Sequence, residues 1–180
     1  MKRLFILSAI AMAAISFSSC DKAAKLLFQP FESPLNVNVS IPVVTSTEVE
    51  SSLGETNVDF NLDEEVKNNT DGKVDGSVVG AIYLNEVGIS LQNADDANNL
   101  SNFEYVTLTI ASGSSTPVVF GPFEIPANAT TNTSFGVSNS PNIKSYFNGA
   151  NVKFIIKGKA KTQTSKILES TIGATLKFDK

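Results

Sequence analysis

Few residues in this chain are of types that could carry out chemistry. It contains a single cysteine, Cys20, and no histidine. Without histidine, a serine or cysteine nucleophile has no imidazole base, and the usual histidine-containing zinc sites are excluded. One cysteine cannot form an intramolecular disulfide or a thiolate cluster. Cys20 must therefore be explained as a core residue or as a point of attachment.

The residues before Cys20 are arranged as in a secretory signal peptide. Lys2 and Arg3 precede an apolar stretch from Leu4 to Phe17, and small residues follow. This stretch is shorter than the ~20 residues that a helix needs to cross a bilayer. The pattern predicts a cleaved signal, residues 1–19, rather than a permanent transmembrane anchor.

Phe17-Ser18-Ser19-Cys20 resembles the lipobox of bacterial lipoproteins, with Phe17 in place of the usual leucine. In that family the cysteine thiol receives a diacylglycerol and the signal is cut just before the cysteine, whose new amino group is acylated. The resemblance covers residues 1–20 only. It implies that acylated Cys20 anchors the protein to a lipid bilayer of the cell envelope. Durable anchoring requires more than one acyl chain, which this modification supplies.

Two alternatives for this segment stay open. An ordinary signal peptidase would accept Ser16 and Ser18 and cut before Ser19, which leaves Cys20 as a free thiol. Residues 1–19 could instead form a buried helix with Cys20 as a small core residue. The outer membrane is favoured over the inner membrane, although Asp21 resembles an inner-membrane retention signal of some bacteria.

Beyond the signal, the sequence divides into a tether and one domain. Residues 20–34 are predicted to be a short membrane-proximal tether that reaches at most about 45 Å. Its apolar side chains either pack on the domain or touch the membrane, and they are Leu26, Leu27, Phe28 and Phe31. Residues 35–180 are predicted to be a single folded domain.

Alternation of apolar and polar residues predicts that this domain is all-β. Pro42 suggests an edge strand at its first segment, and the segment 78–91 could be one bulged strand or two. A single helical turn is expected within 141–147, and no segment after residue 34 keeps a 3.6-residue period. We expect an antiparallel β-sandwich of 7–8 strands with Ig-like architecture, or alternatively a small closed barrel. The predicted strands are 35–43, 58–62, 78–91, 105–111, 117–123, 131–137, 152–156 and 168–178.

Two groups of acids could support glycoside hydrolysis, which needs only a pair of carboxylates. One is Asp63-Glu64-Glu65 with the nearby Asp59, and the other is Asp95-Asp96. Both lie among polar residues, whereas a catalytic acid usually needs apolar burial. Solvated loops are the simpler interpretation, and no catalytic residue is predicted. A hydrolase would need two of these acids in one cleft.

The segment from Asn69 through Asp71 to Asp75 has the closely spaced oxygens that Ca²⁺ prefers. Lys73 stands at a ligand position, however, and the distant glutamate of an EF-hand is missing. Its two Asp-Gly pairs are explained more simply as tight turns. No metal site is predicted.

Phe120 and Phe123 form the compact aromatic group of the domain. Because they are opposite in strand parity, one could project outward to bind a partner, although core packing is the simpler explanation. Removal of residues 1–19 moves the formal net charge from −4 to −6, so nucleic acid is not an expected partner.

Together these features predict a membrane-anchored lipoprotein whose β-sandwich has a non-enzymatic binding or structural role. The expected partners are the bilayer and an envelope protein or glycan. No cofactor is expected besides the acyl chains on Cys20. The alternatives are a carboxylate-dependent glycan hydrolase and a carrier of a small apolar ligand.

Overall fold

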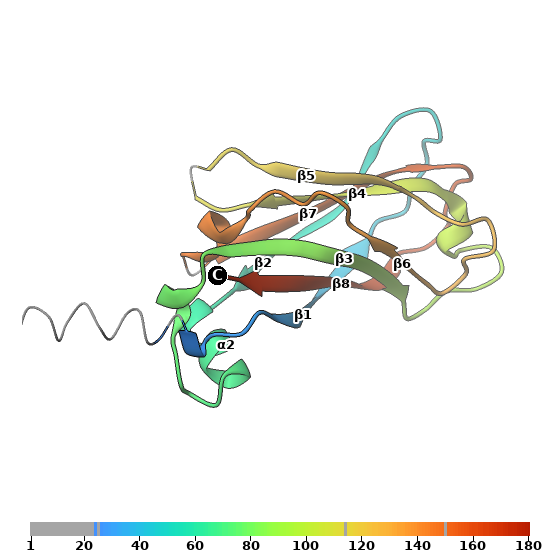
Figure 1. The fold of residues 1–180 in the computed structure, drawn as a ribbon. Coiled ribbons are helices and arrows are strands. Elements are labelled where there is room, and N and C mark those ends of the chain that lie inside the picture. Colours follow the sequence, from blue (N-terminus) through green and yellow to red (C-terminus); the bar gives the residue numbers. More distant parts are fainter. Residues whose placement is uncertain (1–23, 25, 114, 150) are drawn as a thin grey trace, which may run out of the picture.

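The computed structural model describes residues 24, 26–113, 115–149 and 151–180, and two antiparallel sheets packed face to face make up this part of the chain (Figure 1). One sheet has the strand order β1-β8-β3-β6 and the other β2-β7-β4-β5. The strands are β1 (Phe31–Ile41), β2 (Ser51–Asp59), β3 (Ala81–Leu91), β4 (Phe103–Ala111), β5 (Val118–Glu124), β6 (Asn132–Gly136), β7 (Asn151–Ala160) and β8 (Leu168–Asp179). The helical segments are α2 (Leu62–Asn69) and three 3₁₀ turns, η1 (Gly76–Val78), η2 (Leu100–Asn102) and η3 (Lys144–Phe147).

The predicted antiparallel sandwich is confirmed, with eight strands in the described residues. Successive strands β1 and β2 lie in different sheets, and β8 lies between β1 and β3. This order is that of an eight-stranded jelly roll. It differs from the strand order of immunoglobulin domains, so the expected Ig-like character applies to the two-layer architecture alone.

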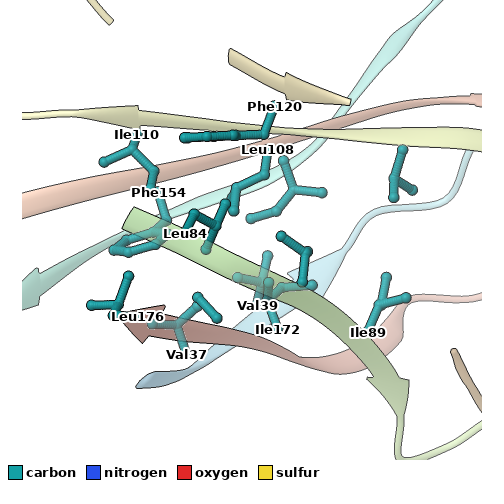
Figure 2. Packing of buried hydrophobic residues seen from close by; sticks show 14 of the residues in the cluster. Val37, Val39, Leu84, Ile89, Leu108, Ile110, Phe120, Phe154, Ile172 and Leu176 are labelled. Atoms are coloured by element: carbon teal, nitrogen blue, oxygen red, sulfur yellow. The ribbon is translucent and has the colours of Figure 1, made fainter. Parts of the chain in front are cut away.

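The core lies between the two sheets, where buried apolar residues such as Val39, Leu84 and Phe154 pack against one another (Figure 2). In β8 every second residue from Leu168 to Phe178 is buried, as the alternation predicted. Between the sheets, residues that include Val87, Leu108 and Ile172 line a cavity of about 10 Å³. A cavity of that size holds at most one water molecule, so it has no room for an apolar ligand.

Two predictions about individual strands are also resolved. β1 is an edge strand, and Pro42 directly follows its last residue. β3 is one strand with a register shift between Leu84 and Glu86, rather than two strands joined by a bend. Such a bulge bends a strand without ending its pairing.

The chain between β2 and β3 departs from the sequence prediction. The strand expected over 58–62 lies earlier in the chain, because β2 ends at Asp59. Leu62, the last residue of the expected strand, begins α2. α2 has eight residues and buries only Val66, so it is too short to show a helical period in the sequence. η3 confirms the helical turn expected within 141–147.

The folded domain begins before the expected boundary at residue 35. β1 starts at Phe31, and Phe28 is completely buried, while Leu26 and Leu27 are 80% and 60% exposed. Half of the expected tether therefore belongs to the domain. Residues 1–23, which include the expected signal peptide and Cys20, lie outside the described residues. Within the part of the chain that the structure describes, no helix is both long and apolar enough to span a membrane.

Candidate functional site

Two neighbouring surface hollows lie at one end of the sandwich, which we call the α2 end. It carries α2, η1, η3 and the last residues of β8, and the described chain starts there (Figure 1). Two grooves of about 550 and 270 Å³ open on either side of Phe60 and Asn61, which line both. Ligand sites commonly combine an apolar floor with a few polar groups, and this end is the strongest candidate for a ligand groove.

Aromatic packing fixes the floor between the two grooves. The Phe60 ring meets Phe147 edge to face, with centroids 4.9 Å apart, and lies nearly parallel to Phe178 at 6.5 Å. Asn61 ends this segment as the N-cap of α2, where its Oδ1 accepts a hydrogen bond from the Glu64 backbone N–H at 3.2 Å. The cap turns the chain away from β2 and lays the helix across the end of the sandwich.

Hydrogen bonds from α2 hold the rest of the site together. Asp63 Oδ1 accepts from the Gly76 backbone N–H at 3.0 Å, which joins the helix to η1. Glu65 Oε1 accepts from Asn69 Nδ2 at 2.9 Å and from the hydroxyl of Ser33 on β1. Asp63 and Glu65, which the sequence placed in a solvated loop, therefore bind α2 to neighbouring segments through hydrogen bonds.

The first acidic group is divided between the two grooves. Asp63 lines the larger groove, whereas Asp59, Glu64 and Glu65 line the smaller one. Asp59 is the last residue of β2, whereas Asp63, Glu64 and Glu65 lie in the first turn of α2 instead of a loop, where negative charge is favourable. Asp59, Asp63 and Glu64 are exposed, so they lack the apolar surroundings that a glycosidase acid usually has.

The second acidic group lies at the opposite end, in the loop after β3. Asp95 Oδ2 pairs with Lys166 Nζ at 2.6 Å, and Asp95 Oδ1 accepts from the backbone N–H of Asn98 at 2.7 Å. The Lys166 ammonium, followed by these loop donors, lowers the pKa of Asp95 to about 2. Asp95 is thus an ionised anchor of its loop and is unsuited to donating a proton.

The segment considered for calcium forms local contacts instead. Asp71 pairs with Lys73 at 3.0 Å, and Asn69 donates its amide to Glu65. Asp71 and Gly72 both have positive φ, as in the expected tight turn. The second Asp-Gly pair differs from that expectation, because Asp75 caps η1 rather than forming a hairpin turn.

Asp75 Oδ1 accepts from the Ser77 hydroxyl at 2.6 Å and from the Ser77 backbone N–H at 3.0 Å. These bonds, the hydroxyl one foremost, lower the pKa of the Asp75 carboxyl. Among the described residues, no group of three or more cysteine, aspartate or glutamate side chains is arranged to hold a metal ion.

Phe120 and Phe123 both lie on the inner face of their sheet, which agrees with core packing, the simpler explanation, and not with the outward projection that their parity allowed. Phe120 pairs opposite Leu108 and Phe123 opposite Val106, with a register shift between these pairs. The extra residue of this bulge reverses the parity, so both rings turn inward. Phe120 is buried, and the half-buried Phe123 stacks on Phe135 at 5.2 Å. Neither ring forms a projecting tip for a partner.

The loops opposite the α2 end, which we call the far end, form a polar cluster that the sequence analysis missed. Asn102 Nδ2 donates to Thr162 Oγ1 at 2.9 Å and to the Ala97 carbonyl at 3.1 Å, and its Oδ1 accepts from the Asn99 backbone N–H. Asn98 is also buried and accepts from the Ser165 backbone N–H at 2.7 Å. The sequence pattern that could have indicated this cluster is the pair Asn99 and Asn102, which have the spacing of a capping box.

Exposed apolar side chains stand on or beside these anchored loops. Val43 and Val49 are 43% and 60% exposed on the loop between β1 and β2, and Ile167 is 52% exposed just before β8. The backbone joins two of these segments, because the Thr164 N–H donates to the Val44 carbonyl at 3.0 Å. The far end therefore presents apolar groups on a fixed backbone.

Comparison with known proteins gives no family for this chain. No family model matches it, and no curated protein matches it in sequence. The solved structures similar to it include the cyanophage Pam1 capsid asymmetric unit, at 10% identity and a TM-score of 0.39 over 84% of this chain and 86% of that one. Another is the infectious bursal disease virus VP2 subviral particle, at 9% identity and a TM-score of 0.38 over 83% of this chain and 33% of that one. At such TM-scores the similarity carries no argument about function.

Proposed function

We propose that this protein is a lipoprotein of the bacterial cell envelope whose jelly-roll domain binds a partner protein while acylated Cys20 anchors it to a membrane. The observation that carries the proposal is the position of Phe28. Among the described residues it is the first that is buried, and it follows Cys20 by only eight positions. A tether this short suits an anchored domain that works close to its membrane.

The far end is the partner-binding face in this proposal. Its loops are tied together by buried asparagines, so little conformational entropy is lost when a partner is bound. Val43, Val49 and Ile167 supply exposed apolar area of the kind that protein interfaces bury. The chain has no tryptophan for an aromatic sugar platform, which favours a protein over a glycan.

Anchoring is tested by replacing the cysteine. Cells that express Cys20→Ala are labelled with a radioactive fatty acid and then fractionated. We expect both the label and membrane retention to be lost, whereas the control Ser19→Ala, which keeps a small residue before the cysteine, retains both. Continued labelling of Cys20→Ala would contradict the proposal. A mature N-terminus at Ser19 in the wild-type protein would show ordinary secretion instead.

Partner binding is tested with two matched valines. Val49 on the far end and Val119 on β5 are 60% and 61% exposed, so glutamate at either position disturbs the fold to a similar extent. Each variant is used to capture proteins from detergent-solubilised native membranes. We expect Val49→Glu to lose a partner that the wild type and Val119→Glu both retain. Equal capture by all three would remove the far end as the binding face.

A glycan hydrolase remains the second candidate because Asp59, Glu64 and Glu65 line one groove. Its mechanism would need one carboxylic acid as proton donor and one carboxylate as base or nucleophile. The assay is release of reducing sugar from envelope glycans by the wild type, Asp59→Asn and Glu64→Gln. Activity that both substitutions abolish would support the hydrolase, and no activity in the wild type would end it for those glycans.

A further inference from the structure

We propose that the domain sits on the bilayer with a defined orientation, in which Leu26 and Leu27 enter the membrane interface and the far end points away from it. This inference rests on the proposed lipid anchor and adds a second, non-covalent contact. The partner of this surface is the boundary between phospholipid headgroups and acyl chains.

The two leucines are held in place by the fold. Phe28 is completely buried, and its backbone N–H donates to the Ala24 carbonyl at 3.1 Å, which closes a helical turn around Leu26 and Leu27. With exposures of 80% and 60%, both leucines present most of their surface to the surroundings. The turn therefore displays two adjacent apolar side chains from a rigid base.

The length of chain outside the described residues limits what can cover these leucines. Cys20 precedes Ala24 by four positions, a reach of at most about 14 Å. When the acyl chains of Cys20 lie in the hydrocarbon layer, the helical turn is held within that reach of the interface. Apolar side chains of interfacial segments insert about 5–10 Å into the boundary between headgroups and acyl chains. The bilayer is therefore the apolar phase nearest to Leu26 and Leu27.

Charges at the same end limit how closely the rest of the domain approaches. The carboxylates of Asp59, Asp63 and Glu64 are exposed there, and anionic headgroups repel them. Lys67 in the last turn of α2 offsets part of this repulsion. Contact is thus centred on the leucines, and zwitterionic vesicles provide the cleanest test.

This orientation also places the proposed binding face. β1 runs from the α2 end to the far end over eleven residues, which corresponds to roughly 33 Å. With the α2 end on the bilayer, the loops that carry Val49 and Ile167 stand away from the membrane, where a partner can reach them (Figure 1).

The absence of tryptophan from the chain makes the orientation measurable. Leu27→Trp and Ile167→Trp each introduce a single fluorophore, at positions 60% and 52% exposed on opposite ends. Each acylated full-length protein is reconstituted into phosphatidylcholine vesicles, with or without phosphatidylcholine brominated near the headgroup. For Leu27→Trp we expect about half of the emission to be quenched and a blue-shifted maximum, as for an interfacial side chain. The Ile167→Trp emission should change little.

Several outcomes decide the matter. Equal quenching of the two tryptophans in vesicle-bound protein would overturn the orientation while leaving the anchor intact. A blue shift at Leu27→Trp without bromine quenching would indicate a protein contact and would also overturn it. Failure of the acylated wild type to float with vesicles would count against the anchor itself. Leu26→Trp serves as a second reporter should Leu27→Trp shift the unfolding midpoint.

Discussion

The rings of Phe31 and Phe178 stack with their centroids 4.6 Å apart, and the two residues are partners in the β1–β8 register. This contact joins the first residue of β1 to the second-last residue of β8. Phe28 packs edge to face on Phe31 at 5.9 Å, so the segment after the proposed anchor is part of the same aromatic cluster. A force applied at the proposed anchor would therefore act directly on this aromatic cluster.

Phe28→Ala should destabilise the domain by about 3–5 kcal/mol, because a fully buried aromatic ring is removed from a packed cluster. Urea unfolding followed by circular dichroism measures this change. Leu26→Ala is the control, and it should alter the free energy of unfolding by less than about 0.5 kcal/mol because Leu26 is exposed. Similar values for the two variants would mean that residues before Phe31 do not belong to the core.

Gly54→Ala should destabilise the domain by about 1–3 kcal/mol. Gly54 has a φ of +135°, and a Cβ there would lie 2.3 Å from Cγ1 of Val39 on the opposite sheet. Gly136→Ala is the matched control, since a Cβ at that strand position meets no atom within 4 Å. Thermal unfolding compares the two, and a Gly54→Ala protein as stable as Gly136→Ala would contradict the close approach of β2 to β1.

Asn102→Ala should cost about 1–3 kcal/mol of unfolding free energy, because it leaves the buried Asn99 backbone N–H without its partner. Hydrogen exchange should show faster opening of both loops at the far end. Asn132→Ala, at an exposed strand position, is the control. If the cluster orders the binding face, Asn102→Ala should also weaken capture of the partner that Val49→Glu loses.

Asp95 makes part of the domain's stability against unfolding depend on pH. Its folded pKa of about 2 lies below the ordinary value of 3.8, chiefly because of Lys166. The stabilising contribution is therefore complete above the ordinary value and is lost as the pH falls through the folded value. Asp95→Asn should lower the unfolding temperature at pH 7 and flatten its decline between pH 4 and 2. A parallel decline in the wild type and the variant would contradict this role, and added salt should reduce the difference at pH 7.

The all-β architecture could be predicted because it is encoded in short, contiguous patterns, and the anchor at Cys20, inferred from a pattern of the same kind, stays a prediction. Alternation with a period of two identifies the inner face of a strand wherever pairing is regular, as in β8. The prediction failed where regularity breaks. The bulge in β5 reversed the parity of Phe123, and α2 was too short to show a period.

The sequence by itself therefore determined the layered β fold and the exclusion of histidine chemistry, and it is the basis of the proposed membrane anchor at Cys20. Only the tertiary structure decided that Phe28 belongs to the core and that Phe31 packs against it. It also decided that four acids divide between two grooves and that asparagines order the far end. The physical reason is that these features depend on contacts between residues far apart in the chain, such as Phe31 with Phe178. Local alternation records which side of a strand is buried, but it does not record which distant segment covers it.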